Sequence, residues 1–387
     1  MLPDTAHRLL RLVQAEQPCP NDVPDDLWPA LLEAAREVEV LGLVAERVLS
    51  QGTRVPPEIA RELEARRRHE ARHHGFHFVE AERIAASFGA RAIPWVLLKG
   101  AGLARTAYAQ PVERAFRDLD VLVAEERHDE AIVALRALGY ADADPAPVQA
   151  AQRATHFHVA LTGPGKPQVE VHWAVVRPED PYRIDPRWLL DGATVAADTP
   201  RVPCPPAEGQ VLHAAASQVR CGFTQLKRVV DVDRIARRGG VDWARVAALA
   251  AEGGLTPAVR LLLELSSELL GTPLDEALAH LPPLGPVRAR LDELGIAGFP
   301  LGLPPSAWGP ARHLVRYRLA RDRGLVVHQF VFPTPFERER MRALGVRRGA
   351  ELAGTAKRTL ILAWLALWQL GLRVAPHRRS HSLRPDR

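Results

Sequence analysis

The spacing of hydrophobic residues divides the chain into a helical beginning, a middle with short strands and a long helical remainder. Across residues 1–87 apolar side chains recur every three or four positions, which predicts amphipathic helices. At 93–98 and 119–123 the pattern changes to short continuous apolar runs, which predict buried strands. From about Glu208 the helical spacing returns. We therefore predict an α+β fold with a small mixed β-sheet and helical regions on both sides of it in the sequence.

The middle of the chain carries the clearest turn signals. The first apolar run ends at Lys99-Gly100, which predicts a tight turn into a helix, and the helix after the second run is predicted to stop at Gly139. Two arms, at 156–162 and 168–174, are predicted to form a hairpin. The Gly-Pro-Gly-Lys sequence between them is interpreted as a turn, because a phosphate-binding loop needs a following serine or threonine and a helix.

The last third of the chain is predicted to be helical. From Glu208 on there are three stretches with helical spacing: 209–238, 241–254 and 256–271. A connection rich in proline and glycine, 282–310, leads to further helices. The most apolar segment, 360–372, has thirteen residues, or about 20 Å of helix, which is too short to cross a bilayer. We predict a buried terminal helix there; the alternative is a membrane-surface contact through 358–387.

The composition is that of an ordinary globular protein of 387 residues, 47% hydrophobic and 25% charged. Three widely spaced cysteines exclude a disulfide scaffold and supply no zinc-binding pair. The first turns carry charged residues instead of a signal peptide, so we expect a cytoplasmic location. We predict four parts: an N-terminal helical region (1–87), a core with the sheet (88–204), a helical substrate or acceptor domain (205–285) and a C-terminal helical region with a basic tail (286–387).

The net charge of +5 gives no strong nucleic-acid signal. Residues 371–387 contain five arginines and one aspartate, so most of the excess positive charge lies in the tail. A protein that follows a nucleic-acid backbone needs a basic groove on its folded surface. The near-neutral body therefore argues against a long nucleic acid as partner.

Three acidic residues stand out in the predicted strands. Asp118 and Asp120 are two positions apart, so in a strand both side chains project from one face. Like charges at this distance are costly without a cation between them, and a site with only oxygen ligands favours a hard ion such as Mg²⁺. Glu170, in the second hairpin arm, would complete a three-carboxylate cluster if that arm lies beside 119–123. Such a cluster can hold two metal ions and suits displacement at phosphorus.

Basic and glycine residues flank this acidic pair. Lys99, Gly100 and Ala101 lie where a strand gives way to a helix, and a helix N-terminus with glycine favours an approaching phosphate. Arg114 and Arg117 directly precede the acidic pair and can neutralise phosphate with bidentate geometry. We therefore expect a triphosphate to bind between the Lys-Gly turn and these arginines.

Three motifs in this order resemble a known family: Leu-Leu-Lys-Gly-Ala-Gly, then Arg-x-x-x-Asp-x-Asp, then Val-Glu-Val-His-Trp. The chain is similar to the bacterial family of largely uncharacterised nucleotidyltransferases within the DNA polymerase β-like superfamily. The resemblance covers about residues 85–200 and implies the nucleotidyltransferase core fold. It implies that Asp118, Asp120 and Glu170 ligate Mg²⁺, with two ions expected and Mn²⁺ as a substitute. The other motif positions implied in nucleotide binding are Lys99, Gly100, Ala101, Arg114 and His172.

The function implied is transfer of a nucleoside monophosphate from an NTP, with ATP as the expected donor, to a hydroxyl-bearing acceptor with release of pyrophosphate. Asp118, Asp120 and Glu170 are the expected catalytic residues. The acceptor stays open between a small molecule, a peptide or protein, and an RNA end. The alternative is a non-catalytic nucleotide-binding or interaction module of the same fold, associated with a membrane surface.

Three further groups of residues are not assigned to the metal site. Asp231 and Asp233 also form an Asp-x-Asp pair, but they lie on a predicted helix, where two residues two apart point about 200° from each other. We interpret them as a surface acid and a helix contact, the first of which can line the cleft. The histidines at 69, 73 and 77 have helical spacing among arginines, so a solvated basic face is favoured over a zinc site. His156 and His158 contact substrate or fill a strand.

Overall fold

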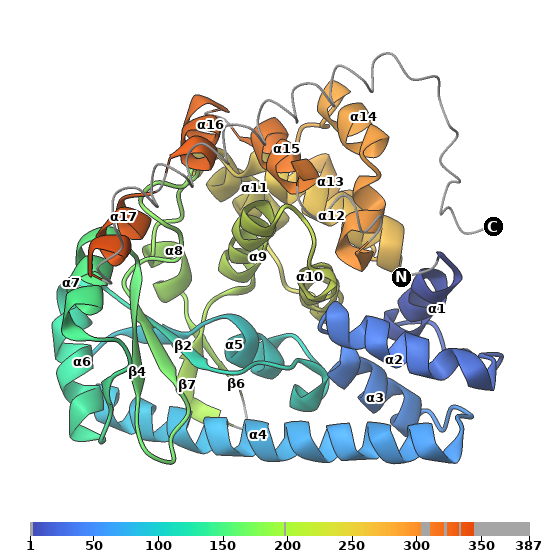
Figure 1. Cartoon of the computed structure of the whole chain (residues 1–387), viewed down its shortest axis with the longest axis horizontal. Helices are drawn as coiled ribbons and strands as arrows, with labels where there is room; N and C mark the ends of the chain where they lie inside the picture. The colour runs from blue at the N-terminus through green and yellow to red at the C-terminus, as the bar shows by residue number, and fades with distance from the viewer. Residues whose placement is uncertain (1–2, 197–198, 303–309, 321–322, 333, 344–387) are drawn as a thin grey trace.

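The computed structural model describes residues 3–196, 199–302, 310–320, 323–332 and 334–343. Four α-helices and the short 3-10 helix η1 (Asp25–Leu27) precede the sheet in the described residues, in agreement with the helical spacing of this region: α1 (Pro3–Val13), α2 (Trp28–Glu37), α3 (Leu41–Ser50) and α4 (Pro57–Gly89). At 33 residues α4 is about 50 Å long and runs beneath the whole molecule in Figure 1. Its first turns pack with α1–α3 in one hydrophobic core, and its last turns pack under the sheet in another.

A five-stranded mixed sheet forms the core, in the order β1-β2-β5-β4-β3. Its strands are β1 (Trp95–Leu97), β2 (Leu119–Val123), β3 (Ala141–Asp142), β4 (His158–Thr162) and β5 (Val169–His172). The pair β2–β5 is parallel and the other pairs are antiparallel. The predicted α+β fold, the two apolar strands and the hairpin are confirmed. The Gly-Pro-Gly-Lys segment is a turn, as predicted, with Gly165 at φ +65°.

Helices α5 (Lys99–Thr106), α6 (His128–Ala137) and α7 (Ala146–Thr155) connect the strands. Helix α6 stops before Gly139, whose φ of +89° suits glycine, as the sequence predicted. One element was missed: after α8 (Arg187–Leu190) the chain forms a separate two-stranded ribbon, β6 (Thr194–Ala196) and β7 (Thr199–Cys204). The prolines in this segment hid the strand pattern, since proline is rare inside strands.

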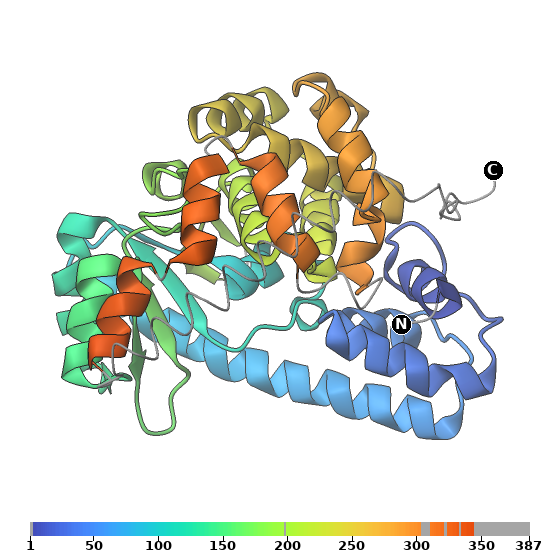
Figure 2. The ribbon, with the colours of Figure 1, turned by 45° about the horizontal axis from the view of Figure 1, so that its top comes forward.

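Helices α9 (Ala207–Cys221), α10 (Leu226–Arg238), α11 (Trp243–Glu252) and α12 (Thr256–Leu270) lie over the sheet, on the side away from α4 (Figures 1 and 2). The stretch 209–238, predicted as continuously helical, is two helices, because Gly222 and Phe223 both have positive φ and turn the chain. These helices share one hydrophobic core with α1–α3. The division into four parts stays a prediction.

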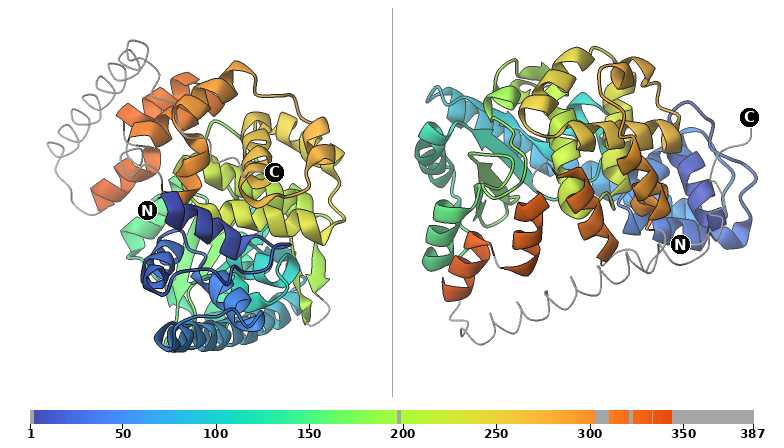
Figure 3. Two further views of the ribbon diagram at one scale, coloured as in Figure 1. Left: turned by 90° about the vertical axis from the view of Figure 1, so that its right-hand side faces the viewer. Right: turned by 90° about the horizontal axis from the view of Figure 1, so that it is seen from above.

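Six shorter helices complete the described chain: α13 (Asp275–Ala279), α14 (Pro286–Glu293), η4 (Ile296–Leu301), α15 (Pro310–Leu319), α16 (Arg323–Val331) and α17 (Pro335–Ala343). The connection over 282–310 therefore contains helix that its prolines and glycines concealed. Helix α17 returns to pack against α7 (Figure 3). None of the described helices has the length and hydropathy needed to span a bilayer. The segments 360–372 and 358–387 lie outside the described residues.

Candidate active site

The turn between β1 and α5 is built around glycines that leave no room for a side chain. A Cβ added to Gly100 would lie 2.5 Å from Phe116 Cβ, and one added to Gly102 would lie 2.2 Å from the carbonyl oxygen of Leu97. Lys99, at the first position of α5, has a φ of +51°, in the left-handed region that residues other than glycine rarely adopt. The Lys-Gly pattern thus marks a tightly packed turn, fixed against the segment that leads into β2.

Replacing Gly100 by alanine is expected to destabilise the fold by about 1–3 kcal/mol, because the added methyl must displace Phe116. Gly75 is the matched control. It lies inside α4 with open space around an added Cβ, so Gly75→Ala is expected to stabilise the protein by about 0.5–1 kcal/mol. Urea unfolding of both variants measures the two effects; a Gly100→Ala variant as stable as the wild type would show that the turn yields easily.

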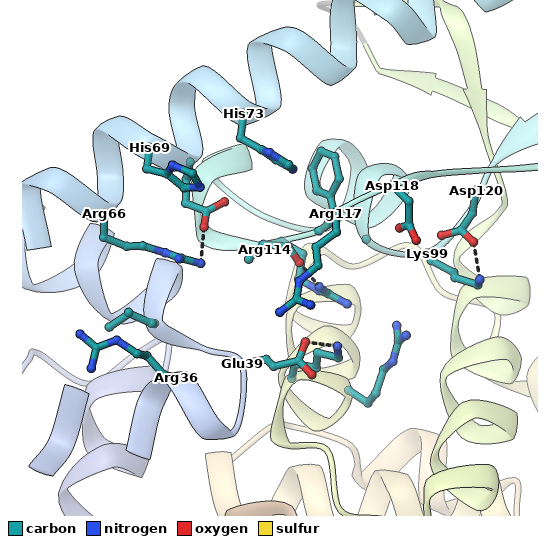
Figure 4. Close-up of a pocket in the computed structure, with 17 residues that line it drawn as sticks. Arg36, Glu39, Arg66, His69, His73, Lys99, Arg114, Arg117, Asp118 and Asp120 are labelled. Atoms are coloured by element: carbon teal, nitrogen blue, oxygen red, sulfur yellow. Dashed lines mark hydrogen bonds and ion pairs between the residues drawn. The ribbon is translucent and has the colours of Figure 1, made fainter. Parts of the chain in front are cut away.

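The three predicted acidic residues come from neighbouring positions of two paired strands. Asp118 directly precedes β2, Asp120 lies within it, and both line one cavity (Figure 4). In the parallel pairing of β2 with β5, Asp120 is the register partner of Glu170. Asp120 is only 3% exposed and is paired with Lys99. Asp118 makes no hydrogen bond or ion pair with any other residue that the structure describes. Asp118 is therefore the carboxylate of this group that is open to a ligand.

His172 connects Asp120 with Glu170. It is completely buried on β5, and its Nε2 atom lies 2.9 Å from Asp120 Oδ1 and 3.3 Å from Glu170 Oε2. The ammonium nitrogen of Lys99 lies 3.5 Å from Glu170 Oε2 and 3.4 Å from His172 Nε2. The structure therefore brings four of the predicted site residues into one polar group. Lys99 supplies the positive charge that partly offsets the two carboxylates.

The pKa values of the two aspartates move in opposite directions. Burial, with the neighbouring Asp120 and Glu170 carboxylates, raises the pKa of Asp118 to about 6. Burial acts in the same direction on Asp120, but the Lys99 ammonium and a hydrogen bond with His172 outweigh it and hold the pKa of Asp120 well below its usual range. The charge of Asp120 is neutralised by Lys99 and His172, whereas that of Asp118 is not. A bound cation would relieve the repulsion that Asp118 meets. The residues therefore fit a divalent metal ion.

Replacing Asp118 by asparagine is expected to stabilise the metal-free protein at pH 7.5 by up to about 3 kcal/mol. Because the pKa of Asp118 is raised in the fold, its ionisation costs stability as the pH rises from about 4 to 6. The gain should therefore disappear near pH 4. Thermal melts of both proteins, with and without Mg²⁺, measure it; Mg²⁺ should raise the melting temperature of the wild type alone. An asparagine variant that is less stable at pH 7.5 would contradict this electrostatic account.

The cavity in front of the aspartates has a volume of about 570 Å³. Its lining carries seven arginine or lysine residues and four carboxylates. Those that the sequence analysis did not assign to the site come from α2, α4, α10 and the turn before α3: Arg36, Glu39, Arg66, Glu70, Lys227 and Arg228. No local motif marks them, since the chain folds them to the cavity from remote positions. Figure 4 shows Arg36, Glu39 and Arg66 across the cavity from the aspartates.

Arg114 is placed differently from the expectation that it meets a triphosphate directly. It is buried, and its guanidinium donates to both carboxylate oxygens of Asp231, at 2.6 and 3.0 Å, and to the carbonyl oxygen of Ala115. The hydroxyl of Tyr108 donates to the same carboxylate at 2.7 Å. The interpretation of Asp231 and Asp233 as including a surface acid is wrong, because both are fully buried. Burial of Asp231 is compensated by Arg114, which lies 117 residues away in sequence.

Of the two arginines predicted to contact phosphate, Arg114 and Arg117, only Arg117 has a guanidinium that is free to bind a ligand. It is exposed, lines the cavity, and makes no side-chain hydrogen bond or ion pair with another described residue. Figure 4 shows its side chain pointing into the cavity. Ala101, by contrast, is buried in the hydrophobic core under the sheet. Its methyl group therefore does not face the cavity.

The histidines of α4 do not form the solvated face that their arginine neighbours suggested. His74 and His77 are buried, and His74 stacks on Phe116 with ring centroids 4.4 Å apart. His77 Nε2 lies 3.1 Å from the carbonyl oxygen of Arg117. The expectation of a solvated face is wrong for these residues because α4 packs against the segment before β2. His69 and His73 do line the cavity.

His158, the first residue of β4, lies on the acidic side of the sheet. His158 Nε2 is 3.7 Å from Glu170 Oε2, so this residue joins the polar group of Asp120 and His172. His156 is buried at the end of α7, where burial and the nearby Arg177 lower its pKa to about 4. The two histidines were expected to contact substrate or to fill a strand. The position of His158 beside the site fits the first of these.

Comparison with known proteins gives one family. A sequence profile described as "uncharacterised nucleotidyltransferase" matches residues 24–271. The match spans the N-terminal helices from just before α2, the whole five-stranded sheet and α9–α12. It therefore includes every cavity-lining residue named above. No curated protein matches the chain.

Proposed function

Since the chain belongs to the family of uncharacterised nucleotidyltransferases, we propose that it moves a nucleoside monophosphate from an NTP to a hydroxyl group. The acceptor oxygen attacks the α-phosphorus, the bond from that phosphorus to the β-phosphate breaks, and pyrophosphate leaves. ATP is the proposed donor, and the cytoplasm is the proposed location. The acceptor is a small molecule, a peptide or protein side chain, or an RNA end.

The observation that carries the proposal is the charge pattern of the cavity. The unpaired Asp118 and the buried Asp120 line a space whose other lining residues include seven arginines and lysines against two glutamates. A bare triphosphate would be repelled by the two aspartates, whereas a triphosphate with a divalent ion matches both signs. A cavity of about 570 Å³ is in the range of nucleotide-sized ligand sites.

Asp118, Asp120 and Glu170 are the proposed ligands for Mg²⁺, with Mn²⁺ as a substitute and two ions as the full complement. When bound, the metal withdraws charge from the phosphate oxygens in the transition state. His172 holds the Asp120 carboxylate in place through its contact at 2.9 Å. Glu170 is proposed to orient the acceptor hydroxyl and accept its proton. Lys99 lies at the same end of the cavity and is proposed to contact the triphosphate.

The phosphate contact that was predicted for Arg114 is proposed to be made mainly by Arg117. Arg114 already uses its guanidinium on Asp231 and Ala115, so it acts as a positioning residue for the segment that carries Asp118. Arg117 has a free guanidinium at the cavity and suits bidentate contact with phosphate oxygens. Gly100 is proposed to mark the turn against which the triphosphate lies.

The test is nucleotide turnover by the full-length protein. Each NTP, labelled on the α-phosphate, is incubated with Mg²⁺ or Mn²⁺ and with pools of small hydroxyl compounds, peptides and RNA, and pyrophosphate and labelled product are measured. The proposal expects both to appear together and to need the metal. Binding of NTP without turnover in any pool would favour the alternative, a non-catalytic nucleotide-binding module.

A further inference from the structure

Two histidines and a glutamate form a second, nitrogen-containing ligand set beside the aspartates. In the antiparallel pair β4–β5, His158 and His172 are register partners, and their rings lie 4.6 Å apart. Glu170 is two residues before His172 on β5, so it projects from the same face. Within the described residues, this is the group whose ligand atoms all lie within 4.8 Å of one another. Both aspartates lie outside that group.

The group is built on rigid elements and is largely shielded from water. Both strands lie inside the five-stranded sheet, with β5 between β2 and β4. His172 is completely buried, and the side chains of His158 and Glu170 are each 17% exposed. Ligands held on paired strands keep their spacing without a metal, so little ordering is needed on binding. A small ion is the kind of ligand that such a group can take.

The position already attracts positive charge. The Lys99 ammonium nitrogen lies 3.4 Å from His172 Nε2 and 3.5 Å from Glu170 Oε2. Lys99 also lines the cavity, so its long side chain can withdraw towards the cavity and leave the strand residues to another cation. The ammonium group and a metal ion would therefore compete for one place.

The chemical types of these three ligands decide which metal ion the group would bind. Imidazole nitrogen is a good ligand for zinc, copper, iron and nickel, whereas Mg²⁺ prefers oxygen ligands. We propose that His158, Glu170 and His172 bind a divalent first-row transition-metal ion, in a position that adjoins the oxygen-only position of Asp118 and Asp120, since His172 Nε2 lies 2.9 Å from Asp120 Oδ1. Zn²⁺ is expected to bind more tightly than Mn²⁺ in such a set.

The inference shares Glu170 with the proposed function but does not depend on turnover. If it holds, Mg²⁺ at the aspartates and a transition metal at the histidines form a mixed pair in the active protein. The sequence-based expectation of two Mg²⁺ ions came from carboxylates alone. His158 was considered as a substrate contact or a strand residue, and not as a metal ligand, because the register that pairs it with His172 is not visible in the sequence.

The experiment is direct metal binding by the full-length protein, without a polyhistidine tag and freed of metal by a chelator. Calorimetric titration with Zn²⁺ and with Co²⁺ measures affinity and stoichiometry, and the visible absorption of Co²⁺ reports nitrogen ligands. The proposal expects one site that millimolar Mg²⁺ does not displace. His158→Gln should weaken Zn²⁺ binding by at least about 100-fold. Lys99→Met should tighten it, because the competing ammonium is gone.

Two controls separate this site from others. His69→Gln removes an exposed histidine of the helical spacing in α4 and should leave Zn²⁺ affinity unchanged. Asp118→Asn should leave Co²⁺ binding intact while abolishing nucleotidyl transfer, so failure of the proposed function would not be mistaken for failure of the metal site. Circular dichroism confirms that each variant is folded. Zn²⁺ affinity that is the same in His158→Gln as in the wild type, or lost equally in His69→Gln, would overturn the proposal.

Discussion

Replacing Asp120 by asparagine is expected to lower the rate of nucleotidyl transfer by about 1000-fold or more. A metal ion at a phosphoryl centre contributes several kcal/mol of transition-state stabilisation, and about 4 kcal/mol corresponds to a factor of 1000. Asparagine keeps the shape of the side chain but removes its negative charge, so the proposed metal loses a ligand. Since Asp120 also faces Lys99 and His172, the variant frees Lys99 as well.

The measurement is pyrophosphate release under single-turnover conditions, at several Mg²⁺ concentrations. Loss of a metal ligand predicts that high Mg²⁺ restores part of the rate, whereas loss of structure does not. Glu126→Gln is the matched control, because Glu126 is an exposed carboxylate six residues further along the chain. That variant should keep full activity. Transfer by Asp120→Asn at the wild-type rate, in a folded protein, would remove the metal mechanism altogether.

The local structure of several motifs could be predicted from the sequence, because it depends on residues that are neighbours along the chain. The apolar run 119–123 is observed as β2 with the same limits. The stop at Gly139 is set by one residue's backbone freedom. The pairing of Asp120 with Glu170 follows once the hairpin's second arm lies beside β2. The spacing of apolar residues and the turn residues thus suffice for the fold class and for placing the acidic residues in strands; that the two strands are neighbours was only a condition of the prediction, and the structure supplies it.

The rest of the site depends on contacts between remote segments. The cationic lining from α2 and α10 reaches the cavity only because those helices share a core with α1 and α3. The burial of Asp231 was not predictable either. A helix with an Asp-x-Asp pair is usually exposed to solvent. The burial of Asp231 is possible because Arg114, from the segment before β2, neutralises its charge. Sequence patterns predict the local structure around Asp231 and around Arg114, but not the contact between them.

The buried ion pair of Arg114 with Asp231 gives the largest expected effect on stability. Replacing Asp231 by asparagine is expected to cost about 3–5 kcal/mol of unfolding free energy, because Arg114 is left as a buried charge without its partner. Tyr108 and Arg228, which also contact Asp231, lose a charged acceptor as well. The melting temperature should fall by roughly 4–6 °C. Thermal and urea unfolding measure the loss.

Asp129→Asn is the matched control, since Asp129 is 79% exposed and pairs with Arg153 at the surface. A surface pair of this kind contributes about 0–1 kcal/mol, so the control should melt close to the wild type. The double variant Arg114→Met with Asp231→Leu removes both charges of the pair and should recover part of the stability that the single variant loses, while Tyr108 and Arg228 still lose their acceptor. Equal losses in the single and double variants would mean that the unpaired charge of Arg114 does not determine the effect.

The same experiment tests how the helical region supports the site. Asp231 belongs to α10, and Arg114 lies four residues before Asp118, so the pair fixes the acidic segment against the helices above the sheet. The double variant is therefore expected to be stable yet to transfer more slowly, because apolar side chains lack the bidentate geometry that holds this segment. A stable double variant with full activity would show that packing alone positions Asp118, and that the pair serves stability only.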